Sequence, residues 1–475
     1  MNVKLWGPGL KPHQITMPAR YFFIQAFDQN NNSITHSLET EPQVIIDGGT
    51  KKKTSCRIWT KLLDRKDGSY IVRYKVYEPC SYVKITLTYE NEQIGNSPYI
   101  INDYVYPDNC YCPQYSLQDV INIWNCGNVP LQIDNDFLNF KKINWDETRL
   151  KVIDQFNKPY SVSLCHYIIK NNQVYRKCYG QHVGFNMFSD SILLSLTRKT
   201  ILPDLEFFIN LGDWPLSSKN MPNKYPIFSW CGSKDANDIV MPTYELTEST
   251  LENMGKVTLD MLSVQGNFKY VWEDRKEILF WRGRDSNKNR LNLIKISKTH
   301  PELFNVSLTN FFFFKDEEDT YGPRSEHISF FKFFDYKYQL SIDGTVAAYR
   351  MPFLLGGGSL VFKPYSKYYE HFYSKLEPNV HYVPVETDLS DLVEKIQWAK
   401  DNDSKAKEIA QSGKKFANTN LLPKNILCYY MHLLNKLSKV TTSNVKVLEG
   451  MELINQKSDY PCDCLNKEKN IKEEL

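Results

Sequence analysis

Residues 1–104 consist largely of short segments in which apolar and polar positions alternate. The segment SYIVRYKVY at 69–77 alternates along its length, as expected of a strand in a sheet with one face in the core. Asp67–Gly68 separates it from a second such segment, RIWTKLLDRK, and is a typical hairpin turn. Several short strands with regularly spaced turns predict an immunoglobulin-like β-sandwich.

From about residue 113 the pattern changes, and strand-like runs alternate with helical ones. Runs such as LEFFIN, EILFWRG, YKYQLSID and GSLVFKP have the character of strands, and FNMFSDSILLSLTRK, NRLNLIKISKTH and DLSDLVEKIQWAKDN that of helices. This alternation predicts βα units and mainly parallel sheets. The region is too long for one sheet, so we expect two doubly wound halves, at about 113–250 and 251–440, with a cleft between them.

The predicted organisation is therefore multidomain, with a β-sandwich at 1–104, an α/β domain at 105–440 and a tail at 441–475. The tail is polar and rich in Lys and Glu, and we expect it to be loosely ordered. With 475 residues, 42% hydrophobic and 24% charged, the chain has the composition of a soluble globular protein. Its net charge of +3 gives no reason to expect nucleic acid as a partner, and no apolar run could span a bilayer.

The C-terminus and the cysteines favour the lumen of the endoplasmic reticulum. The chain ends in KEEL, close to the Lys-Asp-Glu-Leu signal that the retrieval receptor binds. The start MNVKLWGPGL lacks the apolar segment of a signal peptide, which a removed leader or a mispredicted start would explain. The eleven cysteines leave at least one unpaired, and their C-x-C spacings favour disulfides over zinc ligands. N-x-S/T sequons begin at Asn31, Asn305 and Asn402.

The segment INLGDWP places an acidic residue, Asp213, directly after an apolar strand-like run. In open α/β sheets ligands bind beyond the carboxyl ends of the strands. A carboxylate there could accept a proton from a substrate hydroxyl. Taken alone, an Asp-Trp-Pro sequence is explained better as turn chemistry.

A second candidate site is EILFWRGRDSNKNR, which runs from strand through loop to helix. Arg282, Arg284 and Arg290 crowd the loop and the first helical turn, and Asp285 or Ser286 could cap the helix. Arginines around a helix N-terminus form an anion site, although a solvated basic loop has the same sequence pattern. No P-loop or Gly-rich dinucleotide motif is present, which disfavours ATP hydrolysis and NAD binding.

The third candidate is IDGTVAAYRMPFLLGGG. We expect Gly344 and Thr345 to open a helix with Arg350 about one and a half turns in, and Gly356–Gly358 to end it. Alternatively, Arg350 is a surface helix residue. No metal is expected, because the two Asp-x-Asp pairs are interpreted as caps or surface loops. They are Asp134 with Asp136 and Asp401 with Asp403.

Together these segments resemble the protein O-glucosyltransferases, the family of Rumi and of the fungal capsule-associated glycosyltransferases. The resemblance rests on NLGDWP, FWRGRDS with its following arginine, DGTVAAYR, GSLVFK and HYVPVETDLSDL. In the N-terminal region DGSYIVRYKV, YVKITLT and IGNSPY resemble a filamin repeat, a module that binds or positions partners. With its KDEL-like end, the chain is similar over residues 4–475 to the KDEL-motif-containing branch, types 2 and 3.

The resemblance implies a GT-B-like fold of two Rossmann-type halves. It implies transfer of glucose, or in some members xylose, from the UDP-sugar to serine in folded EGF-like repeats, with inversion and without a metal. UDP-glucose would be the donor substrate and no cofactor would be needed. The expected acceptors are EGF-like-repeat proteins of the Notch and fibrillin types.

The resemblance also assigns roles by position, with Asp213 as the catalytic base. The positions that match nucleotide-sugar contacts are Arg282, Arg284, Ser286, Arg290, Thr345, Val346, Ala347, Ala348, Tyr349 and Arg350, the last on the diphosphate. The positions near the acceptor peptide are His182, Val183, Gly184, Phe185, Asn186 and Met187. For the cysteines we expect Cys112 to pair with Cys428 and tie the late helix to the first half.

Three interpretations stay open from the sequence. The first is an O-glucosyltransferase, and the second is an enzyme of the same fold that uses UDP-xylose. The third is a non-catalytic luminal binding protein, which the presence of Asp213, Arg284, Arg290 and Arg350 argues against.

Overall fold

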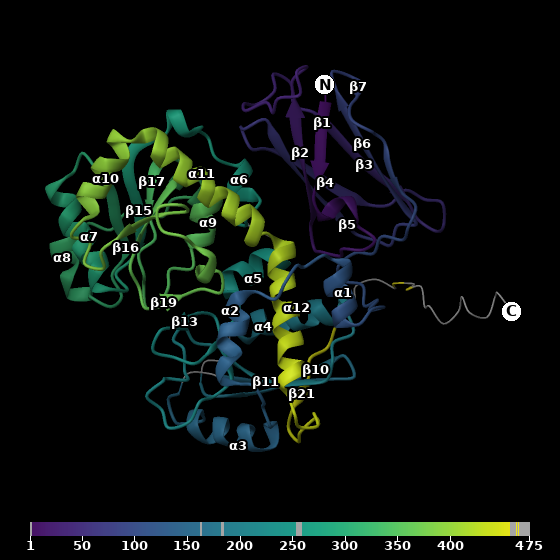
Figure 1. The fold of residues 1–475 in the computed structure, drawn as a ribbon, viewed down its shortest axis with the longest axis vertical. Coiled ribbons are helices and arrows are strands. Elements are labelled where there is room, and N and C mark those ends of the chain that lie inside the picture. The colour runs from purple at the N-terminus through teal and green to yellow at the C-terminus, as the bar shows by residue number, and fades with distance from the viewer. Residues whose placement is uncertain are drawn as a thin grey trace.

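The computed structural model describes residues 2–161, 164–181, 185–252 and 259–456, together with Cys462 and Cys464. It has three parts: an N-terminal β-sandwich and two α/β halves, each with its own sheet (Figure 1). In the described part of the chain, no helix is both long and apolar enough to cross a membrane.

The predicted β-sandwich is confirmed. One antiparallel sheet has the order β1-β2-β5-β4 and the other contains β3, β6, β7 and β8. The strands are β1 (Asn2–Trp6), β2 (Arg20–Phe27), β3 (Gln43–Gly49), β4 (Ile58–Asp64), β5 (Ser69–Val76), β6 (Tyr82–Tyr89), β7 (Glu92–Gln93) and β8 (Tyr99–Ile101). Between the sheets, alternate residues such as Phe22, Val72 and Ile85 form a closed core.

The outer face of the β1-β2-β5-β4 sheet is buried as well. Along β5 nearly every residue is buried, not every second one. Tyr21, Phe23 and Ile71 point away from the sandwich core and join a hydrophobic core that includes residues of both α/β halves. The alternation in SYIVRYKVY therefore predicted the strand correctly, while its outward face packs against another domain.

The first half contains a sheet of order β14-β12-β11-β9-β10-β21. Its strands are β9 (Leu164–Lys170), β10 (Gln173–Tyr179), β11 (Leu205–Asn210), β12 (Ile227–Ser229), β14 (Ile239–Val240) and β21 (Glu452–Leu453). Its helices are α1 (Leu117–Ile123), α2 (Leu131–Asp136), α3 (Trp145–Phe156), α4 (Asn186–Lys199) and α5 (Tyr244–Leu251).

The expectation of a mainly parallel sheet is wrong for part of this half. Strands β11, β12 and β14 are parallel, but β9, β10 and β21 are antiparallel to their neighbours. The antiparallel pairing of β9 with β10 comes from a tight hairpin, where Asn171 and Asn172 both have positive φ. Asn tolerates this backbone region, so the pair Asn-Asn was a readable hairpin signal.

The second half confirms the prediction of a doubly wound parallel sheet. All five strands of its main sheet are parallel, in the order β16-β15-β17-β18-β20. They are β15 (Lys276–Arg284), β16 (Phe304–Asn310), β17 (Tyr336–Leu340), β18 (Leu360–Pro364) and β20 (Val383–Val385). The main helices are α7 (Lys288–Thr299), α9 (Met351–Gly356), α10 (Leu392–Asp401) and α11 (Asp403–Asn420).

The long C-terminal helices connect the two halves. In Figure 1, α11 lies along the second half, and α12 (Pro423–Val440) runs down the first half. The hydroxyls of Tyr429 and Tyr430 donate to the carbonyls of Val240, at 2.9 Å, and Pro242, at 3.1 Å. The described part of the predicted tail is not loose, because β21 adds to the first sheet beside β10.

The cysteines form five disulfides and leave Cys231 free and buried, in line with the expected odd thiol. The predicted pair Cys112–Cys428 is wrong. Cys428 lies on the face of α12 that packs on α1, where it bonds to Cys126, and Cys112 bonds to Cys464. The other pairs are Cys56–Cys80, Cys110–Cys462 and Cys165–Cys178.

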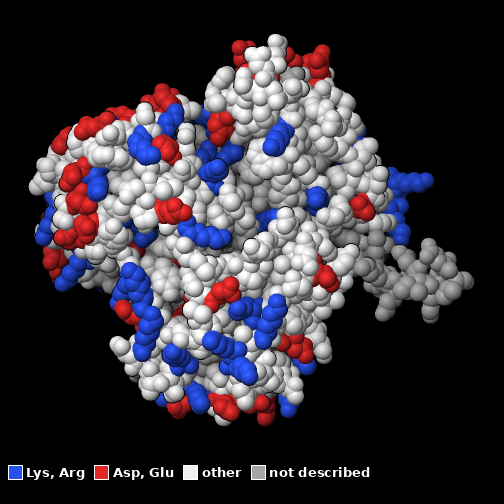
Figure 2. Space-filling model, in the orientation of Figure 1, with Lys and Arg blue, Asp and Glu red and all other residues white. Residues whose placement is uncertain are grey.

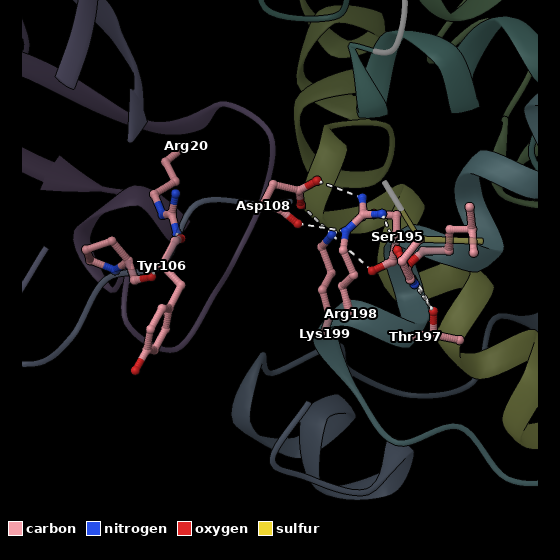
Figure 3. Close-up of polar contacts among 10 residues, drawn as sticks. Arg20, Tyr106, Asp108, Ser195, Thr197, Arg198 and Lys199 are labelled. Atoms are coloured by element: carbon pink, nitrogen blue, oxygen red, sulfur yellow. Dashed lines mark hydrogen bonds and ion pairs between the residues drawn. The ribbon is translucent and has the colours of Figure 1, made fainter. Parts of the chain in front are cut away.

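A polar cluster fixes the segment that links the sandwich to the first half (Figure 3). The guanidinium of Arg20 donates to the carbonyl of Tyr106 at 2.6 Å. Two residues further on, the carboxylate of Asp108 pairs with Arg198, at 3.2 Å, and with Lys199 at the end of α4. Burial lowers the pKa of Lys199 to about 8 against the opposing effect of Asp108. The linker is thus fixed by Arg20 of the sandwich at Tyr106 and by Arg198 and Lys199 of the first half at Asp108.

Candidate active site

A cavity of about 750 Å³, here called the central cavity, lies between the two α/β halves. Its walls are the loop after β11, the start of α5, the end of β15 and the segment between β17 and α9. Lining residues from these walls are Asp213, Tyr244, Glu245, Arg282, Gly283, Arg284, Ser286, Arg290 and 344–350. The second sheet reverses its order between β15 and β17, which is where open α/β sheets bind ligands. The volume of the central cavity suits a small-molecule ligand.

The turn that carries Asp213 is held by other side chains. Buried Asn210 donates through Nδ2 to the carbonyl of Trp214 at 2.7 Å and accepts from the backbone N–H of Gly212 at 2.9 Å. The carboxylate of Asp213 accepts no hydrogen bond from any described residue, although Cys231 Sγ approaches its carbonyl. Burial raises the pKa of Asp213 and nearby Arg284 lowers it, with a net rise. Since Asn210 already organises the turn, the carboxylate is available to a ligand.

Two of the predicted arginines are occupied by the protein itself. Arg290 is buried and donates to the main-chain carbonyls of Asp343, at 2.8 Å, Arg284, at 3.0 Å, and Ile342, at 3.1 Å. Burial, and then Arg350, lower the pKa of its guanidinium to about 9, so it stays protonated at neutral pH. Arg282 donates through its two terminal nitrogens to the side chain and carbonyl of Asn305, while its buried Nε has no partner among the described residues. Both side chains therefore position the cavity wall.

The other two predicted arginines keep donors for a ligand. Arg284 is exposed, and its side chain forms no hydrogen bond with a described residue. Arg350 uses one donor on the carbonyl of Arg282, at 2.5 Å. Burial lowers the pKa of Arg350, and Glu245 opposes that shift. Guanidinium groups bind phosphates bidentately, so Arg284 and Arg350 are the cations suited to an anionic ligand.

We expect Arg284→Ala and Arg290→Ala to have different effects. Arg284→Ala should leave the melting temperature unchanged and weaken UDP binding about tenfold or more, the value of a lost charged hydrogen bond. Arg290→Ala should destabilise the protein by about 2–3 kcal/mol because it leaves main-chain carbonyls unsatisfied. Thermal unfolding and UDP titration of both variants measure this difference. A loss of stability in Arg284→Ala, or none in Arg290→Ala, would reverse the assignment.

The segment 343–350 is a loop of bends and turns and not the predicted helix. Helix α9 starts only at Met351, and Arg350 is its N-cap residue. Pro352 occupies the first turn, where a proline favours a helix start, and this signal was present in the sequence. A Cβ on Gly344 would lie 3.0 Å from Arg290 Nη2, so the loop passes close to the arginine that holds it. The predicted end at Gly356–Gly358 is confirmed, with Gly358 at φ 70°.

The prediction that Asp285 or Ser286 caps α7 is wrong. The N-cap is Asn287, whose side chain accepts from the N–H of Asn289. The fully buried carboxylate of Asp285 instead accepts from the backbone N–H groups of residues 312–314. Asn305, the middle sequon, is engaged with Arg282 and with the hydroxyl of Tyr336.

The sequence did not reveal two further cavity residues, Tyr244 and Glu245. They lie in the first turn of α5, capped by Thr243, and burial raises the pKa of the Glu245 carboxyl. A helix start was readable here, but nothing in the sequence connects it with Asp213. Their presence gives the cavity a second carboxylate.

The predicted acceptor stretch is only partly described, because His182, Val183 and Gly184 lie outside the described residues. Phe185 is half-exposed and stacks on Tyr244 with ring centroids 5.1 Å apart. Asn186 and Met187 begin α4, and Met187 is exposed. The described end of the stretch thus reaches the wall of the central cavity.

The two Asp-x-Asp pairs lie away from the central cavity. Asp134 pairs with Lys436, and buried Asp136 accepts from the N–H of Val240. Asp403 accepts from the indole of Trp272 and from Lys337. Within the described ranges, no group of three His, Cys, Asp or Glu side chains is arranged to hold a metal ion.

Comparisons with known proteins place both parts of the chain. The family model described as Glycosyl transferase family 90 matches residues 122–474, and the Filamin/ABP280 repeat matches residues 1–100. Protein O-glucosyltransferase 2 of Danio rerio is 48% identical over 475 residues, 99% of this chain and 94% of that protein. Protein O-glucosyltransferase 3 of Homo sapiens is 44% identical over 479 residues, 99% and 94% of the two chains. Protein O-glucosyltransferase 1 of Homo sapiens is 31% identical over 298 residues, which are 61% of this chain and 76% of that protein.

Proposed function

This chain belongs to glycosyl transferase family 90, and on that premise we propose that it is a protein O-glucosyltransferase that transfers glucose from UDP-glucose to serine in EGF-like repeats. The resemblance seen in the sequence is confirmed, as is the filamin repeat. The chain is a glycosyltransferase. The donor, the acceptor and the residue roles are the proposal.

One observation supports it above the others. Asp213, with no hydrogen bond to a described residue, shares a cavity with Arg284 and Arg350, whose guanidinium groups have donors to spare. A base and two cations in one cavity match the charges of glycosyl transfer from a nucleotide sugar. The base would accept the proton of the acceptor hydroxyl, and the cations would bind the diphosphate of the leaving group.

The proposed reaction is a single displacement. The serine oxygen attacks the anomeric carbon from the side opposite UDP, and Asp213 takes the serine proton as the new bond forms. The bond between the anomeric carbon and the diphosphate oxygen breaks, and its electron pair leaves on UDP. Arg284 and Arg350 would stabilise that negative charge, so that no metal is needed, and the configuration at the anomeric carbon inverts.

The direct test is transfer onto a folded EGF-like repeat, read by intact-mass spectrometry with UDP-glucose or UDP-xylose, with and without EDTA. Addition of a hexose in the presence of EDTA supports the proposal. Addition of a pentose would instead support the xylosyltransferase. Failure to transfer from either donor, with UDP bound, would mean another acceptor, and failure to bind UDP would favour a non-catalytic binding protein.

The acid limb of the pH profile should depend on Arg284. Asp213 works only when ionised, so activity should fall as the pH drops through its pKa, which burial places above that of an ordinary aspartate. Arg284→Ala removes the cation that lowers this pKa and should move the limb to higher pH. The measurement is kcat/KM against pH for wild type, Arg284→Ala and Arg57→Ala, an exposed arginine of the sandwich. A limb that stays in place, or moves to lower pH, would contradict Asp213 as the base.

We further propose that the two halves correspond to the lobes of a GT-B fold and that the protein works in the lumen of the endoplasmic reticulum. The five disulfides support an oxidising compartment. Retention through a KDEL-type receptor is part of the same proposal. Acceptors of the Notch and fibrillin types are part of the same proposal.

A further inference from the structure

A second cavity of about 650 Å³ lies where the β-sandwich meets the second half. We call it the interdomain cavity. It shares no lining residue with the central cavity. The sandwich contributes Trp6, Phe23 and 65–67, and the second half contributes Phe268, Arg275 and residues of α11. Figure 2 shows Lys and Arg side chains gathered at this junction.

Positive charge in the interdomain cavity exceeds negative charge. Its cations are Arg65, Lys66, Arg275, Lys407, Lys414 and Lys415, and its carboxylates are Asp67 and Glu273. Glu273 pairs with Lys407 and Asp67 with Lys414, the latter at 3.1 Å. In the described structure no ion pair joins the other four cations to these carboxylates, although Asp67 also attracts Arg65 and Glu273 also attracts Arg275.

Two of these cations are also buried. Arg65 is 9% exposed and Arg275 is 6% exposed. Burial, and then Arg65, lower the pKa of Lys414 to about 8 against the opposing effect of Asp67. Like charges held together out of water are unfavourable unless an anion joins them. The cluster therefore has the electrostatics of an anion site.

Arg65 provides a direct indication of a ligand. Its Nη1 donates to the hydroxyl of Ser69 at 3.0 Å, but its buried Nε has no hydrogen-bond partner in the described structure. Buried polar groups are nearly always satisfied. Asn418 on α11, which also lines the cavity, has a buried Oδ1 without a partner.

An aromatic platform lies beside these cations. The ring of Trp6 stacks on Phe23 with centroids 5.3 Å apart, and Arg65 lies over Phe23 at 5.4 Å. Trp6 is 40% exposed, so part of its ring is open to a ligand. A planar group stacked there would carry its charge toward Arg65 and Lys414.

From these observations we propose that the interdomain cavity binds a phosphate-bearing small molecule of nucleotide size. The phosphate groups bind Arg65 and the rim lysines Lys66 and Lys415, Lys414 is shared between the phosphate and Asp67, and the ring of the ligand stacks on Trp6. The cavity volume is that of a small-molecule site and exceeds the needs of a single inorganic anion. Because the ligand contacts both domains, its binding also stabilises their association. The proposal requires no transferase activity.

Isothermal titration of the full chain with inorganic pyrophosphate and with ADP tests the proposal. We expect a binding component that survives Arg284→Ala in the central cavity but weakens at least tenfold in the rim variant Lys66→Gln/Lys415→Gln. This component should weaken with added salt. Lys51→Gln/Lys52→Gln, exposed lysines of the sandwich, is the matched control and should bind as wild type does.

Further titrations show which part of the ligand and which residues account for the binding. ADP should bind more tightly than pyrophosphate, and Trp6→Ala should remove that advantage. Arg65→Met should abolish the component, and the rim variant gives the same answer if Arg65→Met does not fold. Binding that is lost in Arg284→Ala and unchanged in the rim variant would overturn the proposal. Binding of a hexaglutamate peptide without pyrophosphate would also overturn it and indicate an acidic polypeptide partner.

Discussion

Asp213→Asn should lower the rate of glycosyl transfer by about 10² to 10⁴-fold, the usual contribution of a general base. An amide cannot accept the serine proton, so the attacking oxygen would have to lose that proton to water. The substitution is nearly isosteric and removes no hydrogen bond to a described residue, because Asn210 holds the turn. Fold and UDP affinity should therefore be unchanged. Single-turnover transfer measures the rate, and UDP titration measures the binding.

Glu245→Gln is the matched control, because Glu245 is the other carboxylate in the described lining of the central cavity. Glu245 counteracts the effect of burial on the pKa of Arg350, so its neutralisation should alter donor affinity and leave most of the chemical rate. If Glu245→Gln lost the rate and Asp213→Asn kept it, Glu245 would be the base. Equal and large rate losses in both would show that the two carboxylates act together.

The sequence predicted the elements of this protein better than it predicted their surroundings. The strand and helix that hold Arg284 and Arg290 were readable because periodicity and caps are local signals. That Arg290 uses its donors on the carbonyls of 342–343 could not be read, since those residues meet it only through the parallel pairing of β15 with β17. The resemblance identified the residues that line the central cavity. The structure shows which of its arginines bind the cavity wall and which keep donors for a ligand.

Errors in the prediction arose where a partner distant in sequence decides the outcome. Cys428 bonds to Cys126 and not Cys112, because α12 packs on α1, and spacing carries no information about that contact. Two errors had local signals that deserved more weight, namely the hairpin at Asn171–Asn172 and the helix start at Pro352. The alternation along β5 was read correctly as a strand, but it could not show that Arg73 faces another domain.

Arg73→Met should destabilise the protein by about 3–5 kcal/mol, the usual cost of removing one member of a buried ion pair. The guanidinium of Arg73 reaches from β5 to Glu252, at 2.5 Å, and to Asp260, at 3.1 Å. These carboxylates are only 10% and 4% exposed. Asp260 also accepts from the N–H and hydroxyl of Ser263, which itself receives a bond from Arg73. Methionine keeps the length of the side chain but leaves the two carboxylates without this cation.

The effect of Arg73→Met should appear as a lower urea midpoint of the transition that separates the sandwich from the rest of the chain, followed by the fluorescence of the buried tryptophans. Arg57→Met, an exposed arginine of the same domain, should change that midpoint little. Adding Asp260→Asn to Arg73→Met should cost much less than Asp260→Asn alone, because the two residues share one interaction. Independent, additive losses would show that the pair contributes nothing of its own. Coupled losses would mean that Arg73 joins the filamin repeat to the chain at both Glu252 and Asp260. Glu252 directly follows α5, and α5 begins with Tyr244 and Glu245 in the central cavity, so this anchor lies one helix away from the proposed active site.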